Sequence, residues 1–401
     1  MVTRKRKLRT EGSLWEHLRA PRVPYATQTR NLSADVLIVG GGITGAMIAE
    51  MLTEEGLDVV IVDRRGPTKG STVASTALVQ YEIDTPLSEL TRKIGKENAV
   101  RAWRRSRLAV TSLHAFFRER GIAAQSRDSL YLSGNQLGAH DLAYEAELRQ
   151  SAGLETVFLT RAALKDRFGI GRSAALLGFD NLTINPRAAA AQLLCRAAKA
   201  GARLFAPVDI VKLEKRKSHV KAVSRAGHGI RCKWLIFASG YEFPEIVPAK
   251  GHRITTTWAF ATKPQRRRLW PEQCLIWEAS KPYLYMRTTP DGRVLCGGED
   301  AETSDMLSRP GVMERKIARL QGKVGKLFPD IDTRAAFTWS AAFGETATGL
   351  PLIGEIPGYR NCYAALGYGG NGITYSRIAA EILRAALTGD RDPDADLYAF
   401  K

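Results

Sequence analysis

Three regularly spaced glycines near the start of the chain form the pattern that most directly indicates a chemistry. Gly40, Gly42 and Gly45 fit the spacing G-x-G-x-x-G and follow a short apolar run at residues 36–39, which predicts a strand buried on both faces. In this motif the glycines allow a tight turn, an open approach for a pyrophosphate and close packing of a helix on the strand. The spacing therefore predicts a phosphate-binding turn between a strand and a helix.

The residues that follow complete a strand–helix–strand unit. Gly56 ends the predicted helix, residues 59–62 form a second apolar strand, and Asp63 stands at its end. An acidic side chain at that place can accept hydrogen bonds from a ribose. Together these elements predict a site for an adenine dinucleotide, and the alternative is a glycine-rich turn in an ordinary α/β protein.

The loop after Asp63, residues 64–77, is rich in small residues and hydroxyl groups. Placed after the second strand, it could offer backbone N–H groups and hydroxyls to phosphates and pass beneath a bound ring. A flexible surface loop is the alternative.

A second glycine pattern lies near the end of the chain. Gly367, Gly369 and Gly372 repeat the spacing between a predicted strand at residues 361–366 and a helix that runs to about Leu387. No second strand with a terminal acid follows, so a second nucleotide site is excluded. We expect this helix instead to direct its N-terminal N–H groups at an anionic part of the cofactor already bound.

The remaining elements must hold these loops. A helix from Pro186 through Ala200, a return strand at residues 201–210, strand pairs around Val220 and Ile230, and a buried strand at residues 234–240 belong with the first sheet. Two segments, at about residues 83–185 and 250–339, are predicted to lie outside this sheet. Their predicted helices are residues 94–121 and 138–152, and their predicted strands are residues 129–133, 176–180, 254–262, 275–278, 283–287 and 294–298.

One of these strands carries candidate pocket residues. Tyr283, Tyr285 and Arg287 alternate, so on a strand they share one face. They could line a pocket, or they could be routine sheet packing with an exposed arginine.

Composition limits the class of protein. The 401 residues suffice for two domains, and the net charge of +18 favours anionic partners or simply a solvated basic surface. We find no apolar run near the roughly 20 residues of a membrane span, and we expect no secretory signal. The five cysteines are scattered, which predicts buried thiols, no metal site and a cytoplasmic location.

The whole arrangement resembles the D-amino-acid oxidase superfamily of flavoproteins, from about Ala34 to Leu387. The N-terminal arm and Trp339 are similar to the γ-glutamylputrescine oxidoreductase branch, with glycine and sarcosine oxidases as more distant relatives. Beside the two glycine loops, the residues that carry the resemblance are Asn185-Pro186, Val208, Ala238-Ser239-Gly240, Pro290-Asp291-Gly292-Arg293 and Leu350-Pro351-Leu352-Ile353-Gly354.

The resemblance implies an α/β fold: a Rossmann-type, glutathione-reductase-like FAD-binding domain with a discontinuous substrate domain built on an antiparallel sheet. It implies an N-terminal arm at residues 1–33. The FAD-binding domain would comprise residues 34–82, 186–249 and 340–401, and the substrate domain residues 83–185 and 250–339. FAD contacts are implied for Gly40, Gly42, Ile43, Thr44, Gly45, Asp63, Arg64, Ser71, Thr72, Ser75, Thr76, Val208, Ala238, Gly240, Gly370, Asn371, Gly372, Ile373 and Thr374.

Departures from the family pattern refine the expectation. Phe343 stands where simple amino-acid oxidases have an arginine that clamps the substrate carboxylate, and a phenyl ring cannot replace that bidentate fork. Ala341 replaces the cysteine that attaches FAD in sarcosine oxidases, and no histidine lies between His17 and His114, so we expect non-covalent FAD. Thr374 replaces a lysine in the final glycine loop.

The expected function is hydride transfer from the carbon next to an amine nitrogen to flavin N5, giving an imine that water hydrolyses. Oxygen, a quinone or a partner protein could accept the electrons. Two alternatives stay open: action on an aminomethyl group of a tRNA base, which the charge favours although the basic runs lack stacking aromatics, and a flavoprotein subunit of an electron-transfer complex. The candidate catalytic residues are Tyr285, Arg287, His252 and Phe343.

Overall fold

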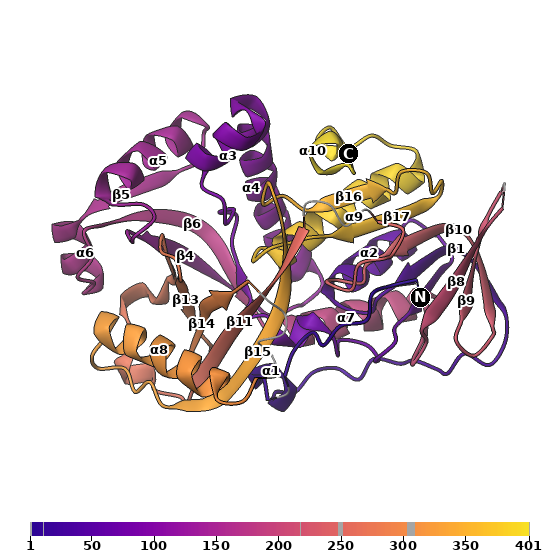
Figure 1. Ribbon diagram of the computed structural model, residues 1–401, viewed down its shortest axis with the longest axis horizontal. Helices are drawn as coiled ribbons and strands as arrows, with labels where there is room; N and C mark the ends of the chain where they lie inside the picture. The colour runs from indigo at the N-terminus through magenta and orange to yellow at the C-terminus, as the bar shows by residue number, and fades with distance from the viewer. Residues whose placement is uncertain (1, 11, 217, 248–251, 303–308, 401) are drawn as a thin grey trace.

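The computed structural model describes residues 2–10, 12–216, 218–247, 252–302 and 309–400. Two sheets organise this part of the chain, and helices cover them (Figure 1). The first sheet has the order β16-β17-β10-β1-β2-β7, with β9 attached to β10 and β8 to β9. Its strands are β1 (Leu32–Val39), β2 (Val59–Val62), β7 (Arg203–Phe205), β8 (Ile210–Lys215), β9 (Val220–Ser224), β10 (Gly229–Phe237), β16 (Leu352–Glu355) and β17 (Cys362–Leu366).

The centre of the first sheet is parallel and fully buried. β1 pairs in parallel with both β10 and β2, and the interior residues Val36, Leu37 and Ile38 are inaccessible to solvent. Helices α7 (Pro186–Lys199) and α9 (Gly372–Thr388) both pack against α2 (Ile43–Glu54) beside this sheet. This confirms the predicted α/β class, and it places the carboxyl ends of β1, β2 and β10 at one edge.

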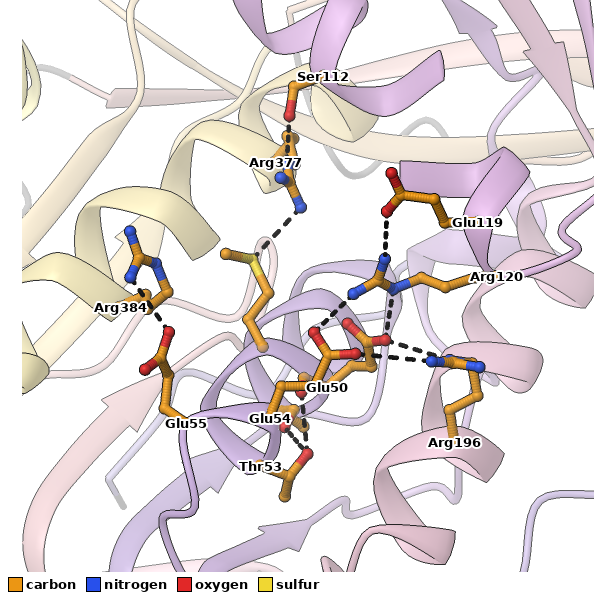
Figure 2. A network of polar contacts seen from close by, with 12 residues as sticks. Glu50, Thr53, Glu54, Glu55, Ser112, Glu119, Arg120, Arg196, Arg377 and Arg384 are labelled. Atoms are coloured by element: carbon orange, nitrogen blue, oxygen red, sulfur yellow. Dashed lines mark hydrogen bonds and ion pairs between the residues drawn. The ribbon is translucent and has the colours of Figure 1, made fainter. Parts of the chain in front are cut away.

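Charged residues tie these helices together at the surface. Glu50 and Glu54 of α2 form ion pairs with Arg120, which follows α4, and with Arg196 of α7 (Figure 2). Arg384 of α9 reaches Glu55 at 3.1 Å. The helix that follows the glycine turn is thus anchored on two sides.

The second sheet has the order β15-β11-β14-β13-β12-β4-β6-β3, with β5 attached to β6. Its pairs are antiparallel except that β12 runs parallel to β4, so the predicted antiparallel sheet is mixed at one pair. Its strands are β3 (Leu78–Val79), β4 (Ala124–Leu132), β5 (Thr156–Thr160), β6 (Ala174–Ile184), β11 (His252–Thr262), β12 (Leu275–Glu278), β13 (Leu284–Thr288), β14 (Val294–Ala301) and β15 (Ala335–Thr346).

The remaining helices cover the second sheet and the junction between the sheets, except that α10 packs against β16 of the first sheet (Figure 1). They are α1 (Leu14–His17), α3 (Leu87–Ile94), α4 (Lys96–Glu119), α5 (Ala139–Ser151), α6 (Arg161–Phe168), α8 (Val312–Leu327) and α10 (Ala395–Tyr398), with short 3₁₀ turns η1 (Ser71–Ala74), η2 (Arg266–Arg268) and η3 (Pro271–Gln273). None of the helices in the described ranges is long and apolar enough to cross a membrane.

Several predicted boundaries were wrong for identifiable reasons. The predicted helix 94–121 corresponds to α4, which begins two residues later because Gly95 adopts φ +82°, and the separate α3 before it was not predicted. The predicted strands near Ile230 and Trp234 form the single strand β10. Helix α8 was missed although its buried Ile317, Leu320 and Val324 show the 3–4 spacing of an amphipathic helix.

The division into domains stays a prediction. Two strands of the second sheet, β3 and the end of β15, include residues that the predicted boundaries assign to the FAD-binding domain. The predicted boundary between residues 249 and 250 lies outside the described residues.

We predict that Gly45→Ala destabilises the protein while Gly322→Ala does not. Both glycines lie in helices, but a Cβ on Gly45 would stand 1.9 Å from the carbonyl oxygen of Gly40, whereas a Cβ on Gly322 would meet no atom within 4 Å. Overpacking at the first site costs about 1–3 kcal/mol, and the second change is neutral or stabilises by up to about 1 kcal/mol. Chemical unfolding of both variants tests this. Equal unfolding midpoints would show that the strand and helix do not pack this closely.

Candidate functional site

A large cavity lies where the two sheets meet. Its lining runs from the end of β2 to the strands of the second sheet, and the space among these residues, open solvent at the mouth included, is about 1670 Å³. Residues of both sheets therefore face the same cavity.

Most of the predicted site residues line this cavity. They are Gly40, Gly42, Ile43, Thr44, Asp63, Arg64, Ser71, Thr72, Ser75, Thr76, Val208, Ala238, Gly240, Gly370, Asn371, Gly372, Ile373, Tyr285 and Phe343. Four predicted residues are not among those that line it: Gly45, Thr374, Arg287 and His252.

The glycine turn is built for close backbone approach. Gly40 has φ +123°, and a Cβ there would stand 2.3 Å from the carbonyl oxygen of Ala238 on the neighbouring strand. The amide of Ile43, in the first turn of α2, donates to Thr72 Oγ1 at 3.0 Å, which ties the following loop to the helix. Ser71 lines the cavity, and its buried Oγ has no hydrogen-bond partner among the described residues.

Asp63 occupies the place expected for a ribose-binding acid. Its carboxylate accepts hydrogen bonds from the amides of Gly41, Arg65 and Gly66 at 2.7–2.9 Å. Burial raises the pKa of this carboxyl, and the three amides oppose the shift. Since a carboxylate has about four acceptor positions, one remains for a ribose hydroxyl.

Three buried donors hold the loop that follows Asp63. Trp339 Nε1 donates to the carbonyl of Ala74 at 2.8 Å, Trp15 Nε1 to that of Ser75 at 2.6 Å, and Arg287 Nη1 to that of Ala77 at 2.6 Å. The donors come from β15, α1 and β13, and all three side chains are nearly inaccessible to solvent. These three hydrogen bonds hold the backbone of the loop in place, while other groups of the same loop line the cavity.

Arg287 therefore supports the loop and does not face a ligand. Its guanidinium also donates to the carbonyl of Ile184 at 3.1 Å and lies 5.4 Å from the ring of Trp15. Burial, with a smaller contribution from the charge of Arg127, lowers its pKa to about 9. Tyr283 and Tyr285 of the same predicted face do line the cavity.

His252 lies away from the cavity at the start of β11. Its ring stacks on Phe243 with the ring centres 3.9 Å apart, and its buried Nδ1 has no partner among the described residues. Burial lowers its pKa, and the nearby charges of Arg4 and Arg6 add to the effect. This environment is that of a packing residue.

The end of the cavity at the second sheet is aromatic. Tyr241, Trp277, Tyr283, Tyr285 and Phe343 line it, and Thr257 Oγ1 lies 3.3 Å from the hydroxyl of Tyr285. Burial raises the pKa values of the three tyrosines, so they are neutral hydroxyls at physiological pH. Among the described lining residues the only basic side chains are Arg64 and Arg65, at the opposite end beside Asp63.

Helix α9 begins at the junction of the two ends. Gly370, Asn371, Gly372 and Ile373 line the cavity there, as the resemblance implied. Asn371 is 4% exposed, and its side-chain nitrogen donates to the carbonyls of Gln80 and Glu82, which leaves Oδ1 buried without a partner. Thr374, which is not among the lining residues, donates a hydrogen bond from Oγ1 to the Gln80 carbonyl at 2.9 Å.

Sequence reasoning missed an acidic residue at this junction. Asp84 lines the cavity, and its Oδ2 accepts a hydrogen bond from the amide of Gly370 at 2.7 Å. The side chain is open to the cavity but deep within the protein, and burial raises its pKa to about 6. No sequence pattern marks Asp84, because its role depends on a loop almost three hundred residues away.

The N-terminal arm closes one side of the cavity. Its backbone pairs with residues after β10, where Arg4 donates to the Phe243 carbonyl at 3.0 Å, and with β15, where Ala342 donates to the Leu8 carbonyl at 2.8 Å. Thr3 and Leu8 line the cavity, and Leu8 packs against Tyr241 and Phe343. The arm thus bridges both sheets along one side of the cavity.

Trp339→Phe should weaken binding of the FAD that the resemblance implies. The change leaves the Ala74 carbonyl without its donor, at a cost of about 1–3 kcal/mol, and so loosens the loop. Trp270→Phe is the matched control, because Trp270 Nε1 donates to the Cys274 carbonyl far from the cavity. Reconstitution titrations followed by flavin fluorescence should show weaker binding in the first variant only. Equal affinities would mean that the loop does not depend on this donor.

Leu8→Ala should speed the release of FAD. The variant removes apolar contacts worth about 1–2 kcal/mol between the arm and the cavity wall. Val23→Ala trims another buried residue of the arm that does not line the cavity, so it should lower stability without changing release. Stopped-flow fluorescence during dilution measures both rates. The same release rate in both variants would contradict a closing role for residues 2–10.

Comparison with known proteins supports this interpretation. The family model described as FAD dependent oxidoreductase matches residues 35–386. The γ-glutamylputrescine oxidoreductase of Escherichia coli is 22% identical, over 92% of this chain and 87% of its own length. A tRNA 5-methylaminomethyl-2-thiouridine biosynthesis bifunctional protein of Cupriavidus necator is 23% identical over 94% of this chain, which spans only 60% of that protein.

Solved structures show the same fold. The glycine oxidase of Geobacillus kaustophilus superposes with a TM-score of 0.76 at 18% identity, covering 90% of this chain and 96% of that one. In the described ranges no group of three or more histidine, cysteine, aspartate or glutamate side chains could hold a metal ion. With the dinucleotide cradle, the small-residue loop and the α9 N-terminus gathered around one cavity, the chain belongs to the FAD-dependent oxidoreductase family of D-amino-acid oxidase type, and FAD is its cofactor.

Proposed function

We propose that this enzyme oxidises an amine at the carbon next to nitrogen. A hydride passes from that carbon to FAD and a proton leaves the nitrogen, which gives an imine that water hydrolyses to a carbonyl compound and a smaller amine. Relatives named for an oxidation of γ-glutamylputrescine and of glycine support amine or amino-acid chemistry.

The residues present fit non-covalent FAD. Gly40, Gly42 and Ile43 would receive the pyrophosphate, Asp63 the ribose, and Val208 the adenine. The N-terminus of α9 would face the ring, where its free N–H groups favour negative charge. When bound, FAD supplies the hydride acceptor, and the protein's task is to hold the substrate carbon against it.

The aromatic end of the cavity is the observation that carries the proposal. It offers apolar walls and neutral hydroxyls, and in the described part of the lining it has no arginine, lysine or histidine. Phe343 indeed lies in that wall. A carboxylate buried there would lack a partner, which costs several kcal/mol. The substrate is therefore an amine without a carboxylate at this end.

We do not propose one particular electron acceptor. Oxygen, a quinone or a partner protein would each complete the cycle after the substrate has been oxidised. Two hypotheses compete with this one. The enzyme could oxidise an aminomethyl group on a tRNA base, which is supported by its similarity to part of a tRNA biosynthesis protein. Alternatively, it could be the flavoprotein subunit of an electron-transfer complex.

Anaerobic titration tests the proposal. We expect purified protein to show flavin absorbance that bleaches with simple amines but not with the matching α-amino acids, since the carboxylate has no partner. Readmitting air then separates an oxidase from a dehydrogenase. Bleaching by α-amino acids alone would contradict the proposal, and reduction only by aminomethylated tRNA would favour that competing hypothesis.

A further inference from the structure

Asp84 is a carboxylate that lines the cavity where it meets the loop before α9. Its Oδ2 is held by the Gly370 amide, and no salt bridge or hydrogen bond of Oδ1 is found among the described residues. With a pKa of about 6 it is a carboxylate at physiological pH. Burial raises the pKa values of Tyr283 and Tyr285, and the charge of Asp300 adds more to these shifts than that of Asp84 does. For Tyr241, Asp84 is the largest contribution to the raised pKa after burial, so Asp84 lies within electrostatic reach of all three rings.

Asn371, the residue after Gly370, carries another acceptor. Two hydrogen bonds fix its side-chain nitrogen, and its buried Oδ1 has no donor among the described residues. Both groups are acceptors, so a ligand that satisfies them must supply N–H or O–H donors. A carboxylate in such a place requires a positive partner.

The aromatic walls also favour a cation. Electron-rich faces of tyrosine and tryptophan attract ammonium groups, by about 0.5–2 kcal/mol for each well-placed ring. The net charge of +18 repels cations from the molecule as a whole, so recognition of a cation must come from local groups.

We propose that Asp84 binds a second, protonated amino group of the substrate, so that the substrate is a diamine or polyamine. This inference rests on the proposed amine oxidation. The reacting nitrogen must be neutral, because an ammonium nitrogen has no lone pair to assist departure of the hydride. A carboxylate stabilises the protonated form of an amine, so the nitrogen that Asp84 holds is a different one from the nitrogen that reacts.

A binding measurement without turnover tests the cation site. Butylguanidinium and butylurea have nearly the same shape and N–H groups, but only the first is charged. Difference absorbance of the FAD-loaded protein should give a dissociation constant at least about tenfold lower for butylguanidinium. In Asp84→Asn, which keeps an acceptor for the Gly370 amide, this preference should fall below about twofold. Asp166→Asn, an exposed residue of α6, should keep it.

Anaerobic reduction kinetics test the substrate class. 1,4-Diaminobutane, 4-aminobutan-1-ol and 1-aminobutane share the reacting amine and differ only at the other end. We expect the diamine to be the best substrate, by at least about tenfold in the apparent second-order rate constant, and Asp84→Asn to abolish its advantage. Equal rates for the three amines, or a preference for butylguanidinium that survives Asp84→Asn, would overturn the inference. If no amine reduces the flavin, the proposed function fails, while the guanidinium and urea pair still decides whether Asp84 binds cations.

Discussion

The close approach of the glycine turn to its neighbouring strands is the constraint on which the rest of the structure depends. A side chain on Gly40 would meet the backbone of Ala238, and one on Gly45 would meet Gly40 itself. Only this contact brings the N-terminus of α2 to the carboxyl edge of a parallel sheet, where an anion can bind between β1 and β10. Every other part of the cavity is placed relative to that edge.

Long-range contacts then join the two sheets around one cavity. The loop after β2 is held by side chains from α1, β13 and β15, and the N-terminus of α9 is held by Gln80, Glu82 and Asp84. The second sheet contributes the aromatic wall, and residues 2–10 cover the junction. The residues that line the cofactor site and those of the proposed substrate site are thus joined through one set of hydrogen bonds and packing contacts.

The sequence alone predicted what depends on local pattern. The glycine spacing, the strand lengths and the terminal acid identified the βαβ unit, since these features follow from backbone conformation over a few residues. It could not predict that Arg287 turns to the Ala77 carbonyl, because alternation along β13 does not reveal what packs behind the sheet. Asp84 was missed for the same reason: its partner Gly370 is distant in sequence, and an isolated aspartate before a proline-started helix usually marks a turn.

The most direct test of the account is a crystal structure of the protein with FAD and a non-reactive amine analogue. The account predicts the pyrophosphate at the α2 N-terminus, the flavin ring against Gly370–Ile373, and the analogue between that ring and the wall formed by Tyr285 and Phe343. A flavin ring outside this wall, or an analogue bound elsewhere, would contradict the assignment of one continuous cavity to cofactor and substrate.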